Sequence, residues 1–190
     1  MATLTSTNIL QWLNESAVGS KLRKGLQVLF DKIYVDIVAV EARCALLETS
    51  VVNCTASTLT VTAATHAGRT VTLNRAAGID VTLPAATGTG NVYRFVVGTT
   101  FTANGTIKVV GDDTMVGVAI FENDSDATVS AFQASGTDDT ITFYTAASNT
   151  TGGVKGAIVT LIDIAADLWQ VTYISSAGGT EATPFSATVA

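Results

Sequence analysis

The 190-residue sequence has little of what most often carries catalysis: one histidine, two cysteines and only 14% charged residues. A general base needs partners within hydrogen-bond reach, and a metal site usually needs several histidine, cysteine or carboxylate ligands. His66 has none of these close in sequence, so we interpret it as a solvated turn residue. Cys44 and Cys54 form neither a disulfide framework nor a metal-binding pattern. The sequence therefore predicts a protein that is not an enzyme, with no catalytic residue, cofactor or metal.

Long apolar runs are also absent. A membrane-spanning helix needs about eighteen or more consecutive apolar residues. The most apolar stretch, residues 28–40, is interrupted by Asp31, Lys32 and Asp36, and the N-terminus does not resemble a secretory signal. The mean hydropathy of +0.41 is nevertheless high. Because a lone subunit rarely exposes large apolar patches, we expect copies of the chain to cover part of this surface, and no membrane partner.

Basic residues are scarce in most of the chain. Residues 1–50 hold five basic and five acidic groups, so the rest of the chain carries the whole net charge of −6. Affinity for nucleic acid depends on lysine and arginine side chains that meet phosphates. The sequence therefore predicts no nucleic-acid partner.

One long helix is predicted from about Lys21 to Glu48. Its apolar residues are spaced by four, three and four positions, and this eleven-residue pattern then recurs. Such a repeat stays close to the natural helical turn, so it favours a nearly straight bundle. We expect the helix to self-associate, with three copies preferred over two; the alternative is one amphipathic helix packed on its own β domain. The predicted interface stripe is Leu22, Leu26, Leu29, Ile33, Ile37, Val40, Cys44 and Leu47.

Residues 58–98 align with themselves in units of ten. Each unit is an alternating Val/Thr/Leu run that ends on a small-residue turn, with glycine at 68, 78, 88 and 98. Alternation with β-branched residues predicts half-buried strands, and the glycines predict turns. Two architectures fit this rhythm: a stacked solenoid, or the opening meander of one closed β domain. We favour the meander because the rhythm stops after residue 98.

Further strands are predicted across the rest of the chain. Turns rich in Gly, Asp, Asn and Ser separate them, so we expect an antiparallel β-sandwich or jelly-roll-like head. The predicted organisation is a helical segment at 1–49, a linker at 50–57, the sandwich at 58–174, and a tail at 175–190 that is flexible or lends a strand to a neighbour. The strand candidates are 106–110, 115–121, 128–133, 140–145, 154–164 and 168–174.

Two groups of side chains in this head allow a binding interpretation. Glu122, Asp124 and Asp126 alternate as calcium ligands do, but the glycine and glutamate of an EF-hand loop are missing, so ordinary turns are favoured. Several aromatic residues can stack on sugars, although most lie on apolar phases of predicted strands. We therefore expect them in the core; they are Tyr93, Phe101, Phe121, Tyr144 and Trp169.

The segment RTVTLNRAAGIDVTLPAATGTGNVYRFVVGTT (69–100) resembles a sequence type found in structural proteins of tailed-bacteriophage virions. The run GGVKGAIVTLIDIAADLWQVTYI (152–174) is similar to a strand–turn–strand ending of the same proteins. Such proteins include capsid decoration or cement proteins, head fibres and tail-fibre modules. They are usually β-rich, often trimeric, and commonly carry a helical segment that docks on the particle. The resemblance covers roughly 65–175 and supplies no catalytic residues.

The resemblance implies a homotrimeric capsid decoration protein that binds the major capsid protein. Such a protein is made in the host cytoplasm and ends on the exterior of the virion. Candidate contacts with an acidic shell are Trp12, Lys21, Arg23 and Lys24; alternatively, Trp12 packs inside the trimer and the basic groups are solvated. A phage fibre or a receptor- or glycan-binding module is the other function considered. A polysaccharide-degrading enzyme would need two facing carboxylates, which the sequence does not reveal.

Overall fold

The computed structural model describes residues 20–48, 51–126, 128–144 and 149–189. The chain divides between Glu48 and Thr49 into two units, which we describe separately. The first contains helix α2, Ser20–Glu48, whose 29 residues span about 44 Å at the usual rise per residue. The helix contains no proline and a single glycine, Gly25, so nothing in its sequence interrupts the backbone hydrogen bonds. The predicted long helix is confirmed.

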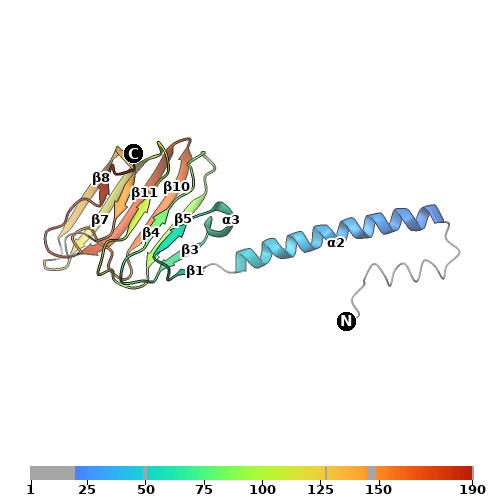
Figure 1. The fold of residues 1–190 in the computed structure, drawn as a ribbon, viewed down its shortest axis with the longest axis horizontal. Helices are drawn as coiled ribbons and strands as arrows, with labels where there is room; N and C mark the ends of the chain where they lie inside the picture. The colour runs from blue at the N-terminus through green and yellow to red at the C-terminus, as the bar shows by residue number, and fades with distance from the viewer. Residues whose placement is uncertain (1–19, 49–50, 127, 145–148, 190) are drawn as a thin grey trace. The chain divides into compact units, whose positions relative to one another are not determined.

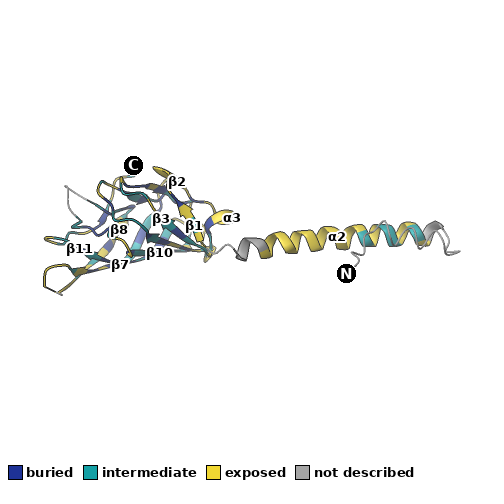
Figure 2. Ribbon diagram, turned by 90° about the horizontal axis from the view of Figure 1, so that it is seen from below, coloured by how far each residue is buried: buried dark blue, intermediate teal, exposed yellow. Residues whose placement is uncertain are grey.

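The second unit is a sandwich of two sheets (Figure 1). Inward-facing side chains from both sheets form one core, and the strand residues that supply it are dark blue in Figure 2. The larger sheet has seven strands, in the order β1 (Val51–Cys54), β3 (Thr70–Leu73), β5 (Val92–Val97), β10 (Ile158–Ala165), β11 (Leu168–Ala177), β7 (Thr114–Asn123) and β8 (Val129–Asp138). The smaller sheet has five, in the order β12 (Phe185–Ser186), β9 (Thr140–Thr142), β6 (Thr106–Lys108), β4 (Asp80–Thr82) and β2 (Thr58–Thr60).

The first six strands wind as a coil between the two sheets. Strands β1, β3 and β5 lie side by side and parallel in the larger sheet, while β2, β4 and β6 do the same in the smaller one. Successive strands therefore alternate between sheets, and each pair of strands makes one turn of a short parallel solenoid. Leu59, Val81 and Ile107 occupy equivalent positions in its three turns. The predicted meander is wrong, and the solenoid alternative describes 51–108.

Turn glycines explain the ten-residue rhythm. Gly68, Gly78 and Gly88 all have positive φ and precede β3, β4 and β5, respectively. Gly78 is also buried, and a Cβ there would overlap the carbonyl oxygen of Asn104. Only glycine combines this backbone conformation with so close an approach. The ten-residue period is thus about the number of residues from a strand in one sheet to the next strand in the other sheet.

The mainly β, two-sheet architecture is confirmed, but the sheets are mixed and not antiparallel. Five of the ten strand pairs are parallel, including β11 with β7, and five are antiparallel. The coil supplies four of the parallel pairs, because a chain that returns to the same sheet by way of the other one arrives in the same direction. Strand direction is therefore a consequence of the winding.

Both ends of the β unit differ from the prediction. Part of the predicted linker, residues 51–54, forms β1 at the edge of the larger sheet, and Asn74 donates its N–H to the carbonyl of Cys54. Part of the predicted tail continues β11 to Ala177, and residues 185–186 form β12, which pairs with β9 of the same chain. Phe185 is 5% exposed. The C-terminal strand is therefore part of this chain's own sandwich.

Aromatic side chains fill the space between the sheets. Tyr173 packs edge-on against Phe121 and Phe143, with ring centroids 5.0 and 5.6 Å apart, and Phe143 packs against Phe101 at 5.3 Å. Burial raises the pKa of the Tyr173 hydroxyl, which donates to the carbonyl of Thr151. Of the five aromatics considered for sugar stacking, four are at most 1% exposed and Tyr144 is half-buried against the core. Their expected core position is confirmed.

A buried carboxylate fastens the 87–89 turn to the larger sheet. Asp163 is 3% exposed and precedes a bulge in β10. It accepts the N–H groups of Thr87, Gly88 and Thr89 at 2.9, 2.6 and 3.1 Å, and the Thr89 hydroxyl at 2.6 Å. Burial alone would raise the pKa of Asp163, but these hydrogen bonds outweigh it and hold that pKa below its ordinary value.

Two further buried aspartates play the same part elsewhere. Asp113 accepts the N–H of Ala86 at 2.7 Å and the indole N–H of Trp169 at 3.2 Å. Asp139 accepts the N–H groups of residues 188 and 189, at 2.8 and 3.0 Å, together with the Thr140 hydroxyl. Burial opposes ionisation of Asp139, yet the hydrogen bonds still lower its pKa. Each carboxylate thus satisfies backbone donors that no strand pairs.

We expect Asp163→Asn to destabilise the β unit by about 2 kcal/mol at pH 7, because an amide oxygen cannot accept all the bonds of the carboxylate. Since the folded-state pKa lies below the unfolded one, the wild-type contribution is present above about pH 4 and is lost as the pH falls through the folded value. Urea unfolding at several pH values measures this. The gap between wild type and variant should narrow in acid, and Asp112→Asn, at an exposed position, should change little. A gap that is independent of pH would contradict the prediction.

Gly117 tests the contact between β7 and β11. It has φ +142°, and a Cβ there would overlap the carbonyl oxygen of Val171, its partner across the strands. We expect Gly117→Ala to cost about 2 kcal/mol or more in the free energy of unfolding. Gly68→Ala is the matched control, because Gly68 also has positive φ but has open space around it. It should cost only about 1 kcal/mol of backbone strain; equal losses in the two variants would exclude the steric explanation.

Candidate functional site

Helix α2 presents an apolar surface to solvent along most of its length. Every residue from 31 to 44 is exposed, as the yellow helix of Figure 2 shows. Soluble helices usually bury their apolar stripe against another element. Within the part of the chain that the structure describes, no helix is long and apolar enough to span a membrane.

The predicted stripe lies on this surface. Leu22, Leu29, Ile33, Ile37 and Val40 are between 42% and 59% exposed. Leu26 is half-buried and Cys44 is an exposed free thiol, while the side chain of Leu47 lies outside the described residues. Ile33, Ile37 and Val40 also line a shallow hollow of about 280 Å³ beside Asp36 and Glu41. The stripe is therefore available to a partner.

Apolar residues also occupy the opposite side of the helix. Val28, Tyr34, Val35 and Val38 are 69%, 68%, 63% and 44% exposed. At about 100° per residue, Val28, Val35 and Val38 lie roughly opposite the stripe. A helix packed on one domain would carry polar residues on that side. Apolar side chains are therefore exposed on more than one side of α2.

The structure describes only some of the candidate capsid contacts. Trp12 lies outside the described residues, and so does the side chain of Lys21. Arg23 is half-buried and Lys24 is exposed, both in the first turns of α2. The first turn of α2 contains no acidic residue. Basic groups at a helix N-terminus oppose the helix dipole, which is mildly unfavourable.

The outer face of the seven-stranded sheet carries a second apolar surface, which the sequence analysis missed. Ile158, Ile174 and Ile120 occupy paired positions on β10, β11 and β7. Val96 of β5 extends the row on one side, and Ala131 of β8 on the other. We call these five residues the isoleucine row. Ile174 is 53% and Ile120 is 37% exposed.

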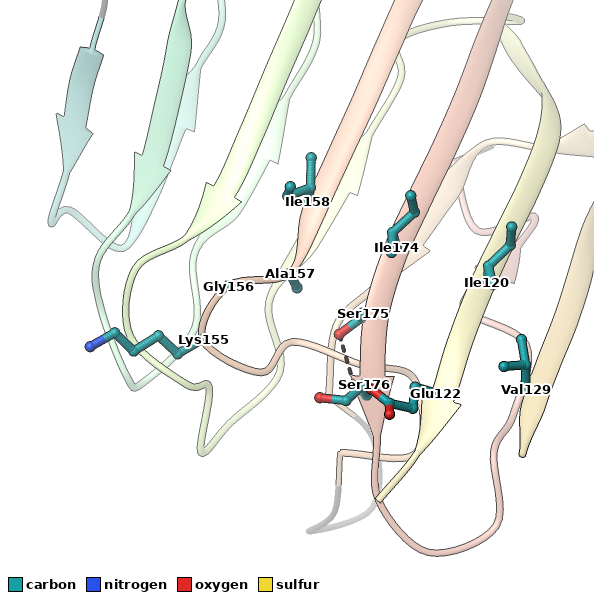
Figure 3. Close-up of a pocket in the computed structure, with 10 residues that line it drawn as sticks. All are labelled: Ile120, Glu122, Val129, Lys155, Gly156, Ala157, Ile158, Ile174, Ser175 and Ser176. Carbon is teal, nitrogen blue, oxygen red and sulfur yellow. Dashed lines mark hydrogen bonds between the residues drawn. The ribbon is translucent and has the colours of Figure 1, made fainter. Parts of the chain in front are cut away.

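Figure 3 shows how this row is bordered. The three isoleucines point to the same side of the sheet, and Val129, 66% exposed, lies beside them on β8. A shallow pocket of about 360 Å³ begins at the row and extends past Ala157, Ser175 and Ser176. Lys155, in the loop before β10, and Glu122, near the end of β7, supply its charges.

A sequence signal for this surface exists. In 115–121 and 158–162, apolar residues occupy both phases of the strand, so that Val116, Val118 and Ile120 accompany the buried Met115, Ala119 and Phe121. Such continuous runs are typical of strands covered on both faces. In the sandwich only the inner phase is covered, which leaves the outer phase available.

Among the described residues, no group of three or more His, Cys, Asp or Glu side chains is placed to hold a metal ion. The acidic turns bind their own backbone: Asp126 accepts the N–H of Thr128, and Asp138 accepts that of Ser135. Asp113, Asp139 and Asp163 are engaged as described above. These contacts are structural.

His66 differs from the prediction. It ends the short helix α3, Ala63–His66, and is 6% exposed, so it is not a solvated turn residue. Its Nδ1 lies 3.0 Å from the backbone nitrogen of Thr62 and accepts that N–H. The ring therefore caps its own turn. The two cysteines are free, Cys44 exposed and Cys54 buried.

The two apolar surfaces are thus the candidate functional sites of this chain. One is the exposed side chains of α2, and the other is the isoleucine row with its pocket. Both suit association with a protein surface better than chemistry on a small molecule. In comparisons with known proteins, no family model, no curated protein and no solved structure matches the chain.

Proposed function

We propose that this chain is a non-enzymatic virion structural protein, a homotrimer that binds and stabilises the capsid shell of a tailed bacteriophage. The observation that carries the proposal is α2, a 29-residue helix with apolar side chains exposed on several sides. A helix of this kind gains stability when copies of it pack together. The β head then becomes a module that the bundle presents in several copies.

A trimer suits α2 better than a dimer. Two packed helices bury mainly one narrow seam, whereas three helices cover a wider arc of each surface. The stripe alone would suit either state, but Tyr34 adds exposed apolar surface beyond it. The spacing of four, three and four residues also keeps the stripe on one side of a nearly straight helix.

The decoration role comes from the resemblance to phage virion proteins over 65–175. A protein that binds only the assembled shell stabilises it by mass action, and this needs no catalytic group. The segment before residue 51 has no net charge, whereas the head carries the net charge of −6. A docking arm and a solvated module would differ in this way. In this proposal the basic residues Arg23 and Lys24 face the major capsid protein.

We expect the purified chain to sediment at about three times its 19.5 kDa mass. Ile37→Lys should dissociate the oligomer, since it places a charge in each copy of the buried stripe, and should weaken association by about 100-fold or more. Ala39→Lys is the matched control, because position 39 is exposed and lies far around the helix from Ile37, beside the charged residues Lys32 and Arg43. Sedimentation equilibrium measures both. A wild-type monomer at micromolar concentration would contradict the oligomer.

Binding to capsids tests the decoration role. We expect the full chain to saturate empty shells of its phage at a fixed number of copies per shell and to raise their resistance to heat. Arg23→Glu with Lys24→Glu should lower the affinity, and added salt should weaken wild-type binding in the same direction. Lys108→Glu, a change of the same sign on β6 of the smaller sheet, is the control. Saturable binding to host cells and none to shells would instead support the fibre or receptor-binding function.

A further inference from the structure

The outer face of the seven-stranded sheet has a layered composition. The isoleucine row runs across five neighbouring strands without a polar interruption. The next row contains Arg94, Thr160, Thr172, Val118 and Gln133, and the one after it contains Val92, Ile162, Gln170, Val116 and Ser135. A solvated sheet face would be polar throughout. Here two rows rich in apolar residues flank a polar one.

The pocket beside the isoleucine row lacks the enclosed shape of a small-molecule site. Small-molecule sites are concave and enclose most of the ligand, with convergent polar groups that orient it. This pocket is shallow; Ile120, Ile158, Ile174 and Val129 form its apolar part, and the polar side chains of Glu122, Lys155, Ser175 and Ser176 border it. A flat apolar strip with charges at its edge is typical of a protein–protein interface.

The charges at the edge are self-complementary. Lys155 and Glu122 both line the pocket, on different elements, so the same surface offers a positive and a negative group. In a ring of three copies, each copy can place its lysine near the glutamate of the next. Complementary charges of this kind favour correct register between the partners.

Chain connectivity makes another head the most available partner. Only residues 49 and 50 separate the end of α2 from β1. If α2 bundles, the heads are therefore held at a high effective concentration, which for short connections is in the millimolar range. Contact between heads that would be too weak for separate domains is then favoured.

We propose that the outer faces of the seven-stranded sheets pack against one another in the oligomer, with Ile120, Ile158 and Ile174 at the centre of the contact. This inference rests on the proposed self-association through α2. The partner is another copy of this chain, and the contact makes the heads one rigid body in place of three tethered domains. The polar row through Thr160 and Thr172 lies beside the contact and supplies hydrogen-bonding groups.

The experiment measures how fast a thiol on this face reacts. In full-length chain carrying Cys44→Ala, Ile174→Cys reports on the proposed contact, and Thr60→Cys, exposed on β2 of the other sheet, is the matched control. We expect the oligomer to protect Ile174→Cys from a maleimide at least tenfold relative to Thr60→Cys. Oxidation with copper phenanthroline should link subunits by a disulfide through Ile174→Cys and not through Thr60→Cys. Equal labelling rates in a confirmed oligomer would overturn the proposal.

Adding Ile37→Lys separates this inference from the proposed function. In that dissociated chain, Ile174→Cys should label as fast as Thr60→Cys. Protection that persists in the monomer would mean that the same chain covers the face, which would also overturn the inference. If the wild-type chain is itself a monomer, the proposed oligomer fails first. A further variant, Ile174→Lys, tests whether this face contacts the capsid instead. If it abolishes shell binding but leaves the oligomer and the labelling of neighbouring positions unchanged, the face belongs to the capsid contact and the inference is wrong.

Discussion

The head depends on one constraint: strands of three or four residues must bury one face between two sheets. Strands β2, β4 and β6 have three residues each, too few to stand as an independent sheet. The coil solves this by stacking Leu59, Val81 and Ile107 in one sheet opposite Val71 and Phe95 in the other. Each turn then covers its neighbour, and the longer strands β7, β10 and β11 continue the sheet where the coil ends. The turn glycines follow from the same constraint, since each reversal must bring the chain directly to the opposite sheet.

Where the strand pairing stops, carboxylates accept hydrogen bonds from the backbone N–H groups. Asp163 holds the turn before β5, and Asp139 holds residues that follow β12. A buried charge is costly unless hydrogen bonds compensate it, and here several N–H groups converge on each carboxylate. This explains how an acidic head can hold acidic residues in its interior. It also means that the perturbed pKa values of Asp163 and Asp139 reflect folding and carry no evidence of catalysis.

Local sequence pattern was sufficient for the elements but not for their arrangement. The spacing from Leu22 to Val40 predicted α2, and alternation predicted most strands and the burial of Trp169 and Phe121. Parallel and antiparallel strands share that alternation, so the winding of 58–98 was misread; the neighbours of a strand depend on contacts distant in sequence. Likewise, a turn containing His66 gives no sign that the ring folds back on Thr62. The isoleucine row was missed in the sequence analysis because apolar residues on both phases of a strand normally indicate that both faces of the sheet are covered. Among the described residues of one chain, only the inner face is covered.

That last mismatch has a physical consequence. Ile174 and Ile120 on the head are exposed, and so are Ile33 and Ile37 on α2. Leaving apolar surface in water has a cost of about 25 cal/mol for each Å². In the oligomer that we propose, the two surfaces would favour the same state: a bundle of α2 would bring heads together, and contact between heads would stabilise the bundle. Because the two contacts share one loss of translational freedom, each can be weak by itself while the assembly is stable. An assembly held by both contacts would also present its heads in a fixed geometry, which binding to a repetitive shell would use.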